Sequence, residues 1–274
     1  MTDRGAAGSG AAGRGVAGPV SVLVTRPAGQ AAGLCAAARA AGYTVYHQPL
    51  LELHGLSPLP PQQRQLVLQL DSYQHIIFIS GNAVSFGMDC IENYWPQLPL
   101  GLNWYAIGNA TAAMLREFGV EVVTPGTAMT SEGLLAVSRL QSVAGQRILI
   151  VKGEGGRSTL REELCRRGAT VDELACYRRS CPALPAGELA RKLSQWRIDT
   201  VIMSSGEGFA NLQALLSSPE TTKFNHLSLI VPSSRVARMA REAGFDQVVT
   251  AENASDAAML RALEGQKPAL ENDE

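Results

Sequence analysis

Leu23-Val24-Thr25-Arg26 and Leu149-Ile150-Val151-Lys152 are the two stretches that decide the fold of this chain. Each is a short apolar run that ends in a basic residue, and a helical segment that stops at a glycine follows each one. The glycines are Gly42 and Gly168, and each lies 16 residues after its basic residue. Equal spacing of this kind indicates that one structural unit occurs twice.

The likeness between the two copies extends over most of the chain. Further pairs of matching segments are Thr44-Val45 with Thr170-Val171, Phe78-Ile79-Ser80-Gly81 with Ile202-Met203-Ser204-Ser205-Gly206, Arg116-Glu117-Phe118-Gly119 with Arg241-Glu242-Ala243-Gly244, Val122-Val123-Thr124 with Val248-Val249-Thr250, and Ser131-Glu132 with Ser255-Asp256. We interpret the chain as a tandem duplication of a unit of about 125 residues.

The apolar pattern from Val20 onward predicts the fold class. Short runs rich in Val and Ile alternate with helical segments rich in Ala, Leu and Arg. The predicted strands are 21–25, 44–46, 75–79, 104–107, 120–123, 147–151, 200–203, 228–231 and 247–249. Apolar strands that alternate with helices are typical of parallel sheets covered on both faces. The sequence therefore predicts an α/β protein.

Composition limits the classes of function. A length of 274 residues suits two domains, and a content of 46% hydrophobic and 18% charged residues is ordinary for a globular enzyme or binding protein. The net charge of −1 argues against a nucleic-acid partner. The sequence contains neither a membrane span nor a secretory signal, so we expect a cytoplasmic protein without a membrane partner.

Histidines and cysteines show no pattern of metal binding. The four histidines are scattered, and the five cysteines include no C-x-x-C pair, so we expect reduced thiols and no metal site. A G-x-S-x-G elbow and an obvious pair of nucleophile and base are also absent. An enzyme of this composition would work by positioning and electrostatics.

Basic and hydroxyl residues follow the predicted strands. Parallel strands deliver their carboxyl ends and the N-termini of the next helices to one edge of a sheet, and two facing edges would form a cleft between domains. The residues predicted there are Arg26, Ser80, Asn82, Gly108, Asn109, Thr111, Lys152, Gly153, Arg157, Ser204, Ser205, Ser233, Ser234 and Arg235. Such cations and donors suit a ligand with carboxylates or phosphates.

A structural interpretation of the same residues stays open at this point. Ser, Thr and Asn in front of helices are commonly caps, and Arg26 and Lys152 could be surface charges. The turn from Gly153 to Arg157 lacks the G-K-[ST] ending of a Walker motif, so it is an anion-binding turn at most.

Tyr177 is the main difference between the copies. It lies in the segment 172–179, which corresponds to 46–53 in the first copy, where Leu51 occupies the equivalent position. A phenol can donate a hydrogen bond or a proton. The alternative is a tyrosine that only packs in a connecting strand.

Taken together, these motifs resemble the uroporphyrinogen-III synthase family. The resemblance rests on the order and spacing of Thr25-Arg26-Pro27, Phe78-Ile79-Ser80-Gly81-Asn82-Ala83-Val84, Ala106-Ile107-Gly108-Asn109-Ala110-Thr111-Ala112, Ser131-Glu132-Gly133-Leu134-Leu135, Lys152-Gly153 to Arg157, and Cys176-Tyr177-Arg178-Arg179. It runs from about Val20 to Leu263. Lys152 and the turn Val231-Pro232-Ser233-Ser234 depart from the family's usual Arg-Gly and glycine-containing turns.

The resemblance implies an interleaved duplication with two flavodoxin-like, parallel-sheet domains. Domain 1 would comprise 20–50 plus 178–265, and domain 2 would comprise 54–174. Two extended connectors, Pro49 to Leu53 and Leu174 to Ser180, would join them. We interpret 1–19 as a flexible leader and 266–274 as a flexible tail.

The resemblance also implies the chemistry. The family cyclises the linear tetrapyrrole hydroxymethylbilane to uroporphyrinogen III, with loss of water, inversion of ring D and no cofactor. Tyr177 would assist departure of the hydroxyl group, and Thr111, Ser80, Ser204 and Ser234 would bind the eight-carboxylate substrate. We expect a monomer that meets the preceding enzyme of the pathway only transiently. The alternatives are a two-lobed binding protein for an anionic small molecule and, less favoured, an enzyme of nucleotides or sugar phosphates.

Overall fold

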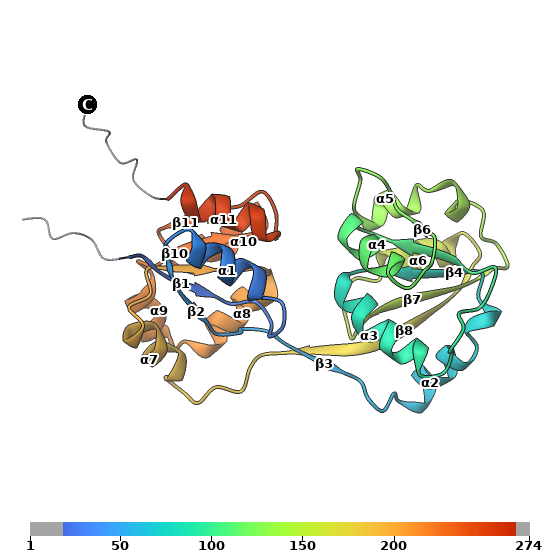
Figure 1. Cartoon of the computed structure of the whole chain (residues 1–274), viewed down its shortest axis with the longest axis horizontal. Coiled ribbons are helices and arrows are strands. Elements are labelled where there is room, and N and C mark those ends of the chain that lie inside the picture. Colours follow the sequence, from blue (N-terminus) through green and yellow to red (C-terminus); the bar gives the residue numbers. More distant parts are fainter. Residues whose placement is uncertain (1–18, 267–274) are drawn as a thin grey trace, which may run out of the picture. The chain divides into compact units, whose positions relative to one another are not determined.

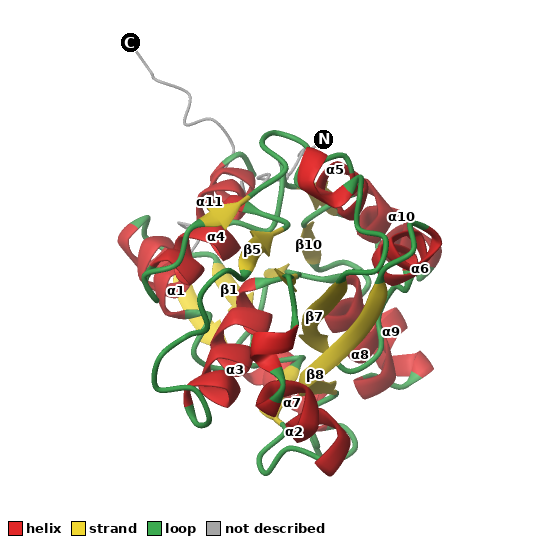
Figure 2. Cartoon of the chain, turned by 90° about the vertical axis from the view of Figure 1, so that its right-hand side faces the viewer, coloured by secondary structure: helices red, strands yellow, loops and turns green. Residues whose placement is uncertain are grey.

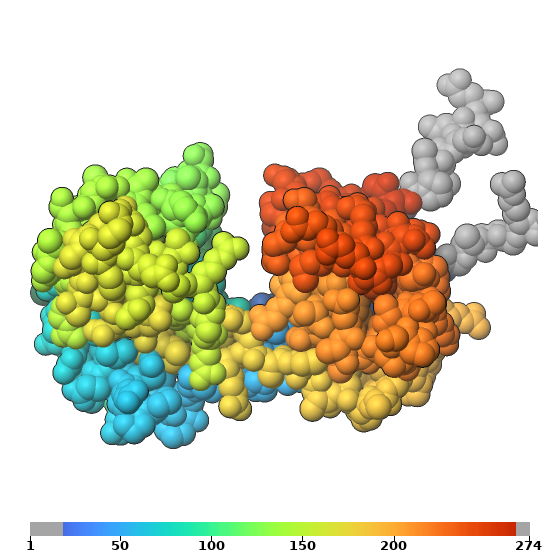
Figure 3. All heavy atoms as spheres, turned by 180° about the vertical axis from the view of Figure 1, so that it is seen from behind, coloured from blue at the N-terminus to red at the C-terminus, as the bar shows by residue number. Residues whose placement is uncertain are grey.

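The computed structural model describes residues 19–266 of the chain, which divide into two compact units. Unit 1 consists of the described residues up to Glu52 and from Cys181 onward, and unit 2 is Leu53–Ser180. The middle of the sequence, cyan to yellow in Figure 3, thus forms a body of its own. The predicted leader and tail lie almost entirely outside the described residues.

Unit 1 contains a five-stranded sheet in the order β11-β10-β9-β1-β2 (Figure 1). Its strands are β1 Ser21–Val24, β2 Thr44–His47, β9 Thr200–Ile202, β10 Ser228–Val231 and β11 Val248–Thr250. All four pairings in this sheet are parallel. Blue strands from the start of the chain therefore lie beside orange strands from its end.

Helices cover both faces of this sheet. They are α1 Ala32–Ala40, α7 Glu188–Gln195, α8 Gly206–Leu215, α9 Ser218–Phe224, α10 Ser234–Glu242 and α11 Asp256–Glu264. Leu23 points to the face packed by α7, α8, α9 and α10, whereas Val22 and Val24 point to the face packed by α1 and α11. Apolar residues on both faces explain why the strands are apolar without alternation.

Unit 2 contains a six-stranded sheet in the order β3-β8-β7-β4-β5-β6. Its strands are β3 Glu52–Gly55, β4 His75–Phe78, β5 Asn103–Ala106, β6 Val122–Val123, β7 Arg147–Gly153 and β8 Thr170–Ser180. The pairings from β8 to β6 are parallel, and β7 and β8 run side by side in Figure 2. Glu52 is the last residue of unit 1 by compactness, although β3 belongs to this sheet.

The helices of unit 2 also divide between two faces. They are α2 Pro61–Leu68, α3 Gly81–Glu92, α4 Asn109–Arg116, α5 Ser131–Leu135 and α6 Thr159–Arg166, with 3₁₀ turns η1 Leu70–Ser72 and η2 Ser138–Leu140. Ile76 and Phe78 pack under α2, α3 and α4, and Ile77 packs under α5 and α6. Among residues 19–266, no helix is long and apolar enough to cross a membrane.

The predicted α/β class with parallel sheets is confirmed, and the strand pattern differs in two places. The segment from Leu174 to Ser180, expected as a connector, belongs to the 11-residue strand β8. β3 was not predicted as a strand. Both differences have one cause, which is the length of the β7–β8 pairing. β7 continues to Gly153 and pairs with β8 as far as Tyr177. The long β8 then offers its other side to β3.

Candidate functional site

The predicted site residues gather at the carboxyl edge of the sheet in each unit. Parallel pairing brings the ends of β1, β9 and β10 to one edge of unit 1. It likewise brings the ends of β4, β5, β7 and β8 to one edge of unit 2. The helices that follow begin there, so their N-terminal N–H groups line these edges.

Two of the serines predicted for the site in unit 1 act as helix caps. The Ser205 hydroxyl accepts a hydrogen bond from the Gly208 N–H at 3.0 Å and caps α8. The Ser233 hydroxyl accepts from the Val236 N–H at 3.5 Å and caps α10. The next residue, Ser234, is exposed at the first position of α10. The capping interpretation is therefore right for Ser205 and Ser233, and Ser234 stays available to a ligand.

Arg235 reaches from α10 to the beginning of α8. A Cβ atom placed on Gly206 would lie 2.9 Å from its Nη2 atom, so the guanidinium lies against the first turn of α8. In residues 19–266 it has no carboxylate partner, and its Nη1 lies 3.6 Å from the Met239 sulfur. An exposed cation beside a helix N-terminus attracts anions strongly, because both carry positive charge.

Arg26 is occupied by contacts inside unit 1. Its Nε donates to the Ser204 hydroxyl at 3.1 Å, and its Nη2 donates to the Ala254 carbonyl at 2.6 Å. Its Nη1 forms an ion pair with Asp256 in the first turn of α11. The side chain is only 12% exposed. Arg26 therefore ties the end of β1 to α11, and a ligand carboxylate would have to compete with Asp256.

In unit 2, α3 and α4 begin in different ways. The Ser80 hydroxyl caps α3 by accepting from the Ala83 N–H at 3.2 Å, and Asn82 is half-buried in the first turn. Gly108 precedes α4 and offers no side-chain cap. Thr111 is buried in the first turn of α4. Within the described part of the chain, the N-terminal N–H groups of α4 thus have no side-chain cap and can bind an anion.

The end of β7 holds a buried cation and an exposed one. Lys152 is 7% exposed, and its Nζ lies 2.9 Å from Glu173 Oε1 on β8. Beyond it, Gly155 and Gly156 have φ angles of +70° and +89°, which other residues rarely adopt. These glycines turn the chain so that Arg157 follows on the surface. Arg157 is the freer of the two cations for an anionic ligand.

Tyr177 lies beside Gly153 at the same edge. The register of β7 and β8 shifts between Lys152 and Gly153, so that Gly153 pairs with Tyr177. The tyrosine ring covers Gly153 and stacks on Phe86 with ring centres 5.2 Å apart. The residue is 2% exposed, yet its hydroxyl makes no hydrogen bond within residues 19–266. A bulge of this kind re-aims a side chain, here a phenol whose ring is packed and whose hydroxyl is uncommitted.

The neighbouring thiol is not a nucleophile. Burial raises the pKa of Cys176 to about 12, and its Sγ donates to the Lys152 carbonyl at 3.3 Å. Cys176 is therefore a neutral, packed residue at physiological pH. Residues 19–266 also contain no group of three or more His, Cys, Asp or Glu side chains that could hold a metal ion.

Sequence reasoning missed three partners in these edges. Phe86 stacks on Tyr177, Glu173 pairs with Lys152, and Asp256 pairs with Arg26. Asp256 had a recognisable place after the Ser255 cap, but nothing in the sequence placed it near Arg26. The other two contacts depend on the packing of α3 and the register of β8, which a single sequence does not reveal.

Gly153→Ala tests the contact between Gly153 and Tyr177. The added Cβ would lie 2.6 Å from the ring carbon Cζ, so we expect the ring to shift and the free energy of unfolding to fall by about 1–3 kcal/mol. Gly108→Ala is the matched control, because no atom lies within 4 Å of its added Cβ and its φ of −125° suits alanine. Urea denaturation compares the two, and equal midpoints would contradict the packing described.

Comparison with known proteins identifies the family. The family model described as "Uroporphyrinogen-III synthase HemD" matches residues 33–261. The uroporphyrinogen-III synthase of Escherichia coli is 33% identical over 252 residues, which cover 89% of this chain and 100% of that protein. The corresponding protein of Proteus mirabilis is 32% identical over 73% of this chain and 98% of its own length.

Solved structures agree on the fold. A mutant uroporphyrinogen III synthase of the extremely thermophilic bacterium Thermus thermophilus aligns with a TM-score of 0.58 at 20% identity, over 90% of this chain and 100% of that chain. The uroporphyrinogen-III synthetase of Helicobacter pylori aligns with a TM-score of 0.57 at 14% identity, over 90% and 99%. With the family model matching most of its length, this chain belongs to the uroporphyrinogen-III synthase family.

Proposed function

We propose that the protein dehydrates and cyclises hydroxymethylbilane to uroporphyrinogen III, with inversion of ring D and without a cofactor. The observation that carries this proposal is the 33% identity that extends over the whole length of the E. coli enzyme. The chemistry of the two sheet edges agrees with a substrate rich in carboxylates, because the edges offer cations, hydroxyl groups and helix N-termini. We expect a cytoplasmic monomer that meets other pathway enzymes transiently.

The strand orders support descent of the two units from one duplicated ancestor. The orders β2-β1-β9-β10-β11 and β8-β7-β4-β5-β6 correspond strand for strand, with β1 matching β7 and β2 matching β8. The first copy's opening strands lie in the sheet formed by the end of the chain, as an interleaved duplication requires. Domain 1 would then be 20–50 plus 178–265 and domain 2 would be 54–174, with extended connectors at 49–53 and 174–180.

Each unit would bind part of the substrate's carboxylates. In unit 1, Arg235, Ser234 and the N-terminus of α8 supply positive charge and donors, with Ser204 and Ser205 beside them. In unit 2, Arg157 and the uncapped N-terminus of α4 have the same role, with Ser80, Asn82 and Thr111 nearby. Arg26, which is half-buried, and Lys152, which is buried, contribute as paired cations that hold these edges in shape.

Tyr177 would act on the departing hydroxyl group. Its phenol can donate the hydrogen bond, and then the proton, with which this group leaves as water. The azafulvene cation that remains is closed through a spiro intermediate, which reopens and recloses with ring D inverted. Gly153 and Phe86 fix the ring, so the hydroxyl is held in place before the substrate binds. Exclusion of water protects the cation from capture.

Turnover of hydroxymethylbilane tests the proposed activity directly. The substrate is supplied by the preceding enzyme in a coupled reaction, and the oxidised porphyrins are resolved by chromatography. We expect the type III isomer to dominate. Formation of the type I isomer alone, as in a reaction without enzyme, would contradict the proposal.

Tyr177→Phe separates catalysis from packing. The ring stays in its stack, and only the hydroxyl is lost, so we expect kcat to fall by about tenfold or more while the urea midpoint stays unchanged. Tyr105→Phe is the matched control. The buried Tyr105 hydroxyl lies 3.0 Å from His75 Nδ1, and it is not part of the carboxyl edge. This substitution should cost about 1 kcal/mol of stability and leave kcat unaltered. An unchanged kcat in Tyr177→Phe would remove Tyr177 from the mechanism.

Arg235→Gln tests the carboxylate contact in unit 1. Loss of its charge at the N-terminus of α8 should raise KM by about fivefold to tenfold, with a weaker salt dependence. Arg238→Gln is the matched control on the same helix. The Arg238 side chain is 73% exposed, and its Nε lies 3.8 Å from Glu242 Oε1. The control should leave KM within about twofold of the wild type. Equal effects of the two substitutions would mean that only total charge matters.

A further inference from the structure

Unit 2 has a large pocket at the end of its sheet opposite to the candidate site. We call it the Trp104 pocket, and it measures about 1010 Å³. It lies where β5 begins and where α3 and α4 end, at Glu92 and near Glu117. The candidate site residues lie where the same helices begin. No step of the proposed reaction uses this pocket.

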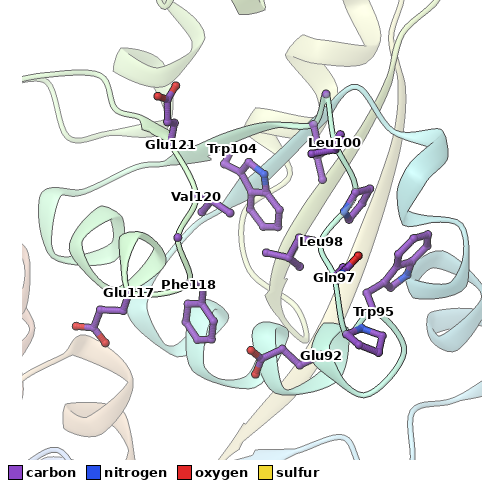
Figure 4. Close-up of a pocket in the computed structure, with 15 residues that line it drawn as sticks. Glu92, Trp95, Gln97, Leu98, Leu100, Trp104, Glu117, Phe118, Val120 and Glu121 are labelled. Carbon is purple, nitrogen blue, oxygen red and sulfur yellow. The ribbon is translucent and has the colours of Figure 1, made fainter.

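The floor of the Trp104 pocket is apolar and rigid. Leu98, Trp104 and Val120 point towards one another in Figure 4, and the Phe118 ring lies below them. Trp104 is 5% exposed and stacks on Phe78 with ring centres 6.0 Å apart. A floor held in this way binds an apolar side chain without first losing conformational entropy.

The margin of the pocket is negative. Glu92, Glu117 and Glu121 are exposed there, and none of them forms an ion pair among residues 19–266. Its lining includes no Lys, Arg or His. Arg116 and Arg139 line a neighbouring depression, which shares Val120 and Glu121 with the pocket. The C-terminal ends of α3 and α4 add the negative ends of two helix dipoles.

The end of α3 lacks the charge that helix stability favours. A cation stabilises the last turn of a helix, whereas α3 has no basic residue in its last turn and ends at Glu92; α4 does carry Arg116 in its last turn, directly before Glu117. Local sequence choices that oppose stability are expected at functional sites. The same charges would repel a polycarboxylate, so the pocket is not a second subsite for the substrate.

The loop over the pocket has the character of a contact surface. Residues 93–102 contain five large apolar or aromatic side chains and two prolines, and Leu100 is 100% exposed. The prolines limit the freedom of the loop. In addition, the Trp95 Nε1 donates to the Val67 carbonyl at 2.7 Å and fixes the loop to α2. An exposed leucine on a fixed loop beside an apolar hollow marks a place where another chain binds.

We propose that the Trp104 pocket docks a basic segment of a partner protein, which inserts an apolar side chain onto the floor while its Lys or Arg residues face the three glutamates. Charge complementarity selects a basic partner. The apolar floor selects a polypeptide over a small hydrated cation, because only an anchor side chain gains from covering Leu98 and Trp104. The docking leaves the candidate site at the opposite edge open, so it is compatible with turnover.

A labelled peptide probes this surface on the full-length protein. The probe is an octapeptide of alternating lysine and leucine with one central tryptophan, and its binding is followed by fluorescence anisotropy. We expect saturable binding that a peptide with glutamate in place of lysine, or serine in place of leucine and tryptophan, does not show. The triple substitution Glu92→Gln, Glu117→Gln, Glu121→Gln should raise the Kd by at least about tenfold and leave turnover unchanged.

A second triple variant keeps the test specific. This control variant carries Asp71→Asn, Asp246→Asn and Glu264→Gln, which lie at exposed positions outside the pocket. It changes the net charge by the same amount as the pocket variant. Its Kd for the probe should stay within about twofold of the wild-type value. An equal loss in both triple variants, or binding of the serine peptide as tight as that of the probe, would overturn the proposal. Concentration-dependent dimers in analytical ultracentrifugation that the pocket variant abolishes would assign the surface to a second copy and overturn it as well.

Discussion

The parallel pairing of β1 with β9 is the constraint on which the rest of the structure depends. It places Val22–Val24 beside Thr200–Ile202, and the Thr25 hydroxyl adds a bond to the Ile202 carbonyl at 2.8 Å across 177 residues of sequence. Because β1 lies inside its sheet, unit 1 needs both ends of the chain. Unit 2 is continuous and closes its sheet over shorter separations. This long-range pairing thus makes unit 1 discontinuous in sequence and leaves the middle of the chain as unit 2.

Parallel pairing also explains why the two ends of unit 2 differ in chemistry. All carboxyl strand ends meet at one edge together with helix N-termini, which is a donor-rich and positive place. The opposite edge collects strand beginnings and the C-termini of α3 and α4. The candidate anion site and the acidic Trp104 pocket therefore occupy the two poles that the fold creates, and side chains reinforce the polarity at each.

Three residues of the candidate site also have structural contacts within their own unit. Arg26, Lys152 and Tyr177 are all largely enclosed, and each has a structural contact: Asp256, Glu173 and Phe86 respectively. Such contacts fix the orientation of polar groups before a ligand arrives, which is what catalysis by positioning requires. Arg157 and Arg235, by contrast, are exposed cations at these edges.

The sequence by itself determined the α/β class, nine of the strands and the set of residues at the strand ends. These follow from local rules, because apolar runs, glycine stops and capping serines act over a few residues. Only the tertiary structure decided which of those residues pair with one another. The bulge that sets Tyr177 over Gly153, the carboxylates opposite Arg26 and Lys152, and the Trp104 pocket all depend on register and on packing between distant segments. Those contacts join residues that no local pattern relates, which is why the sequence alone could not reveal them.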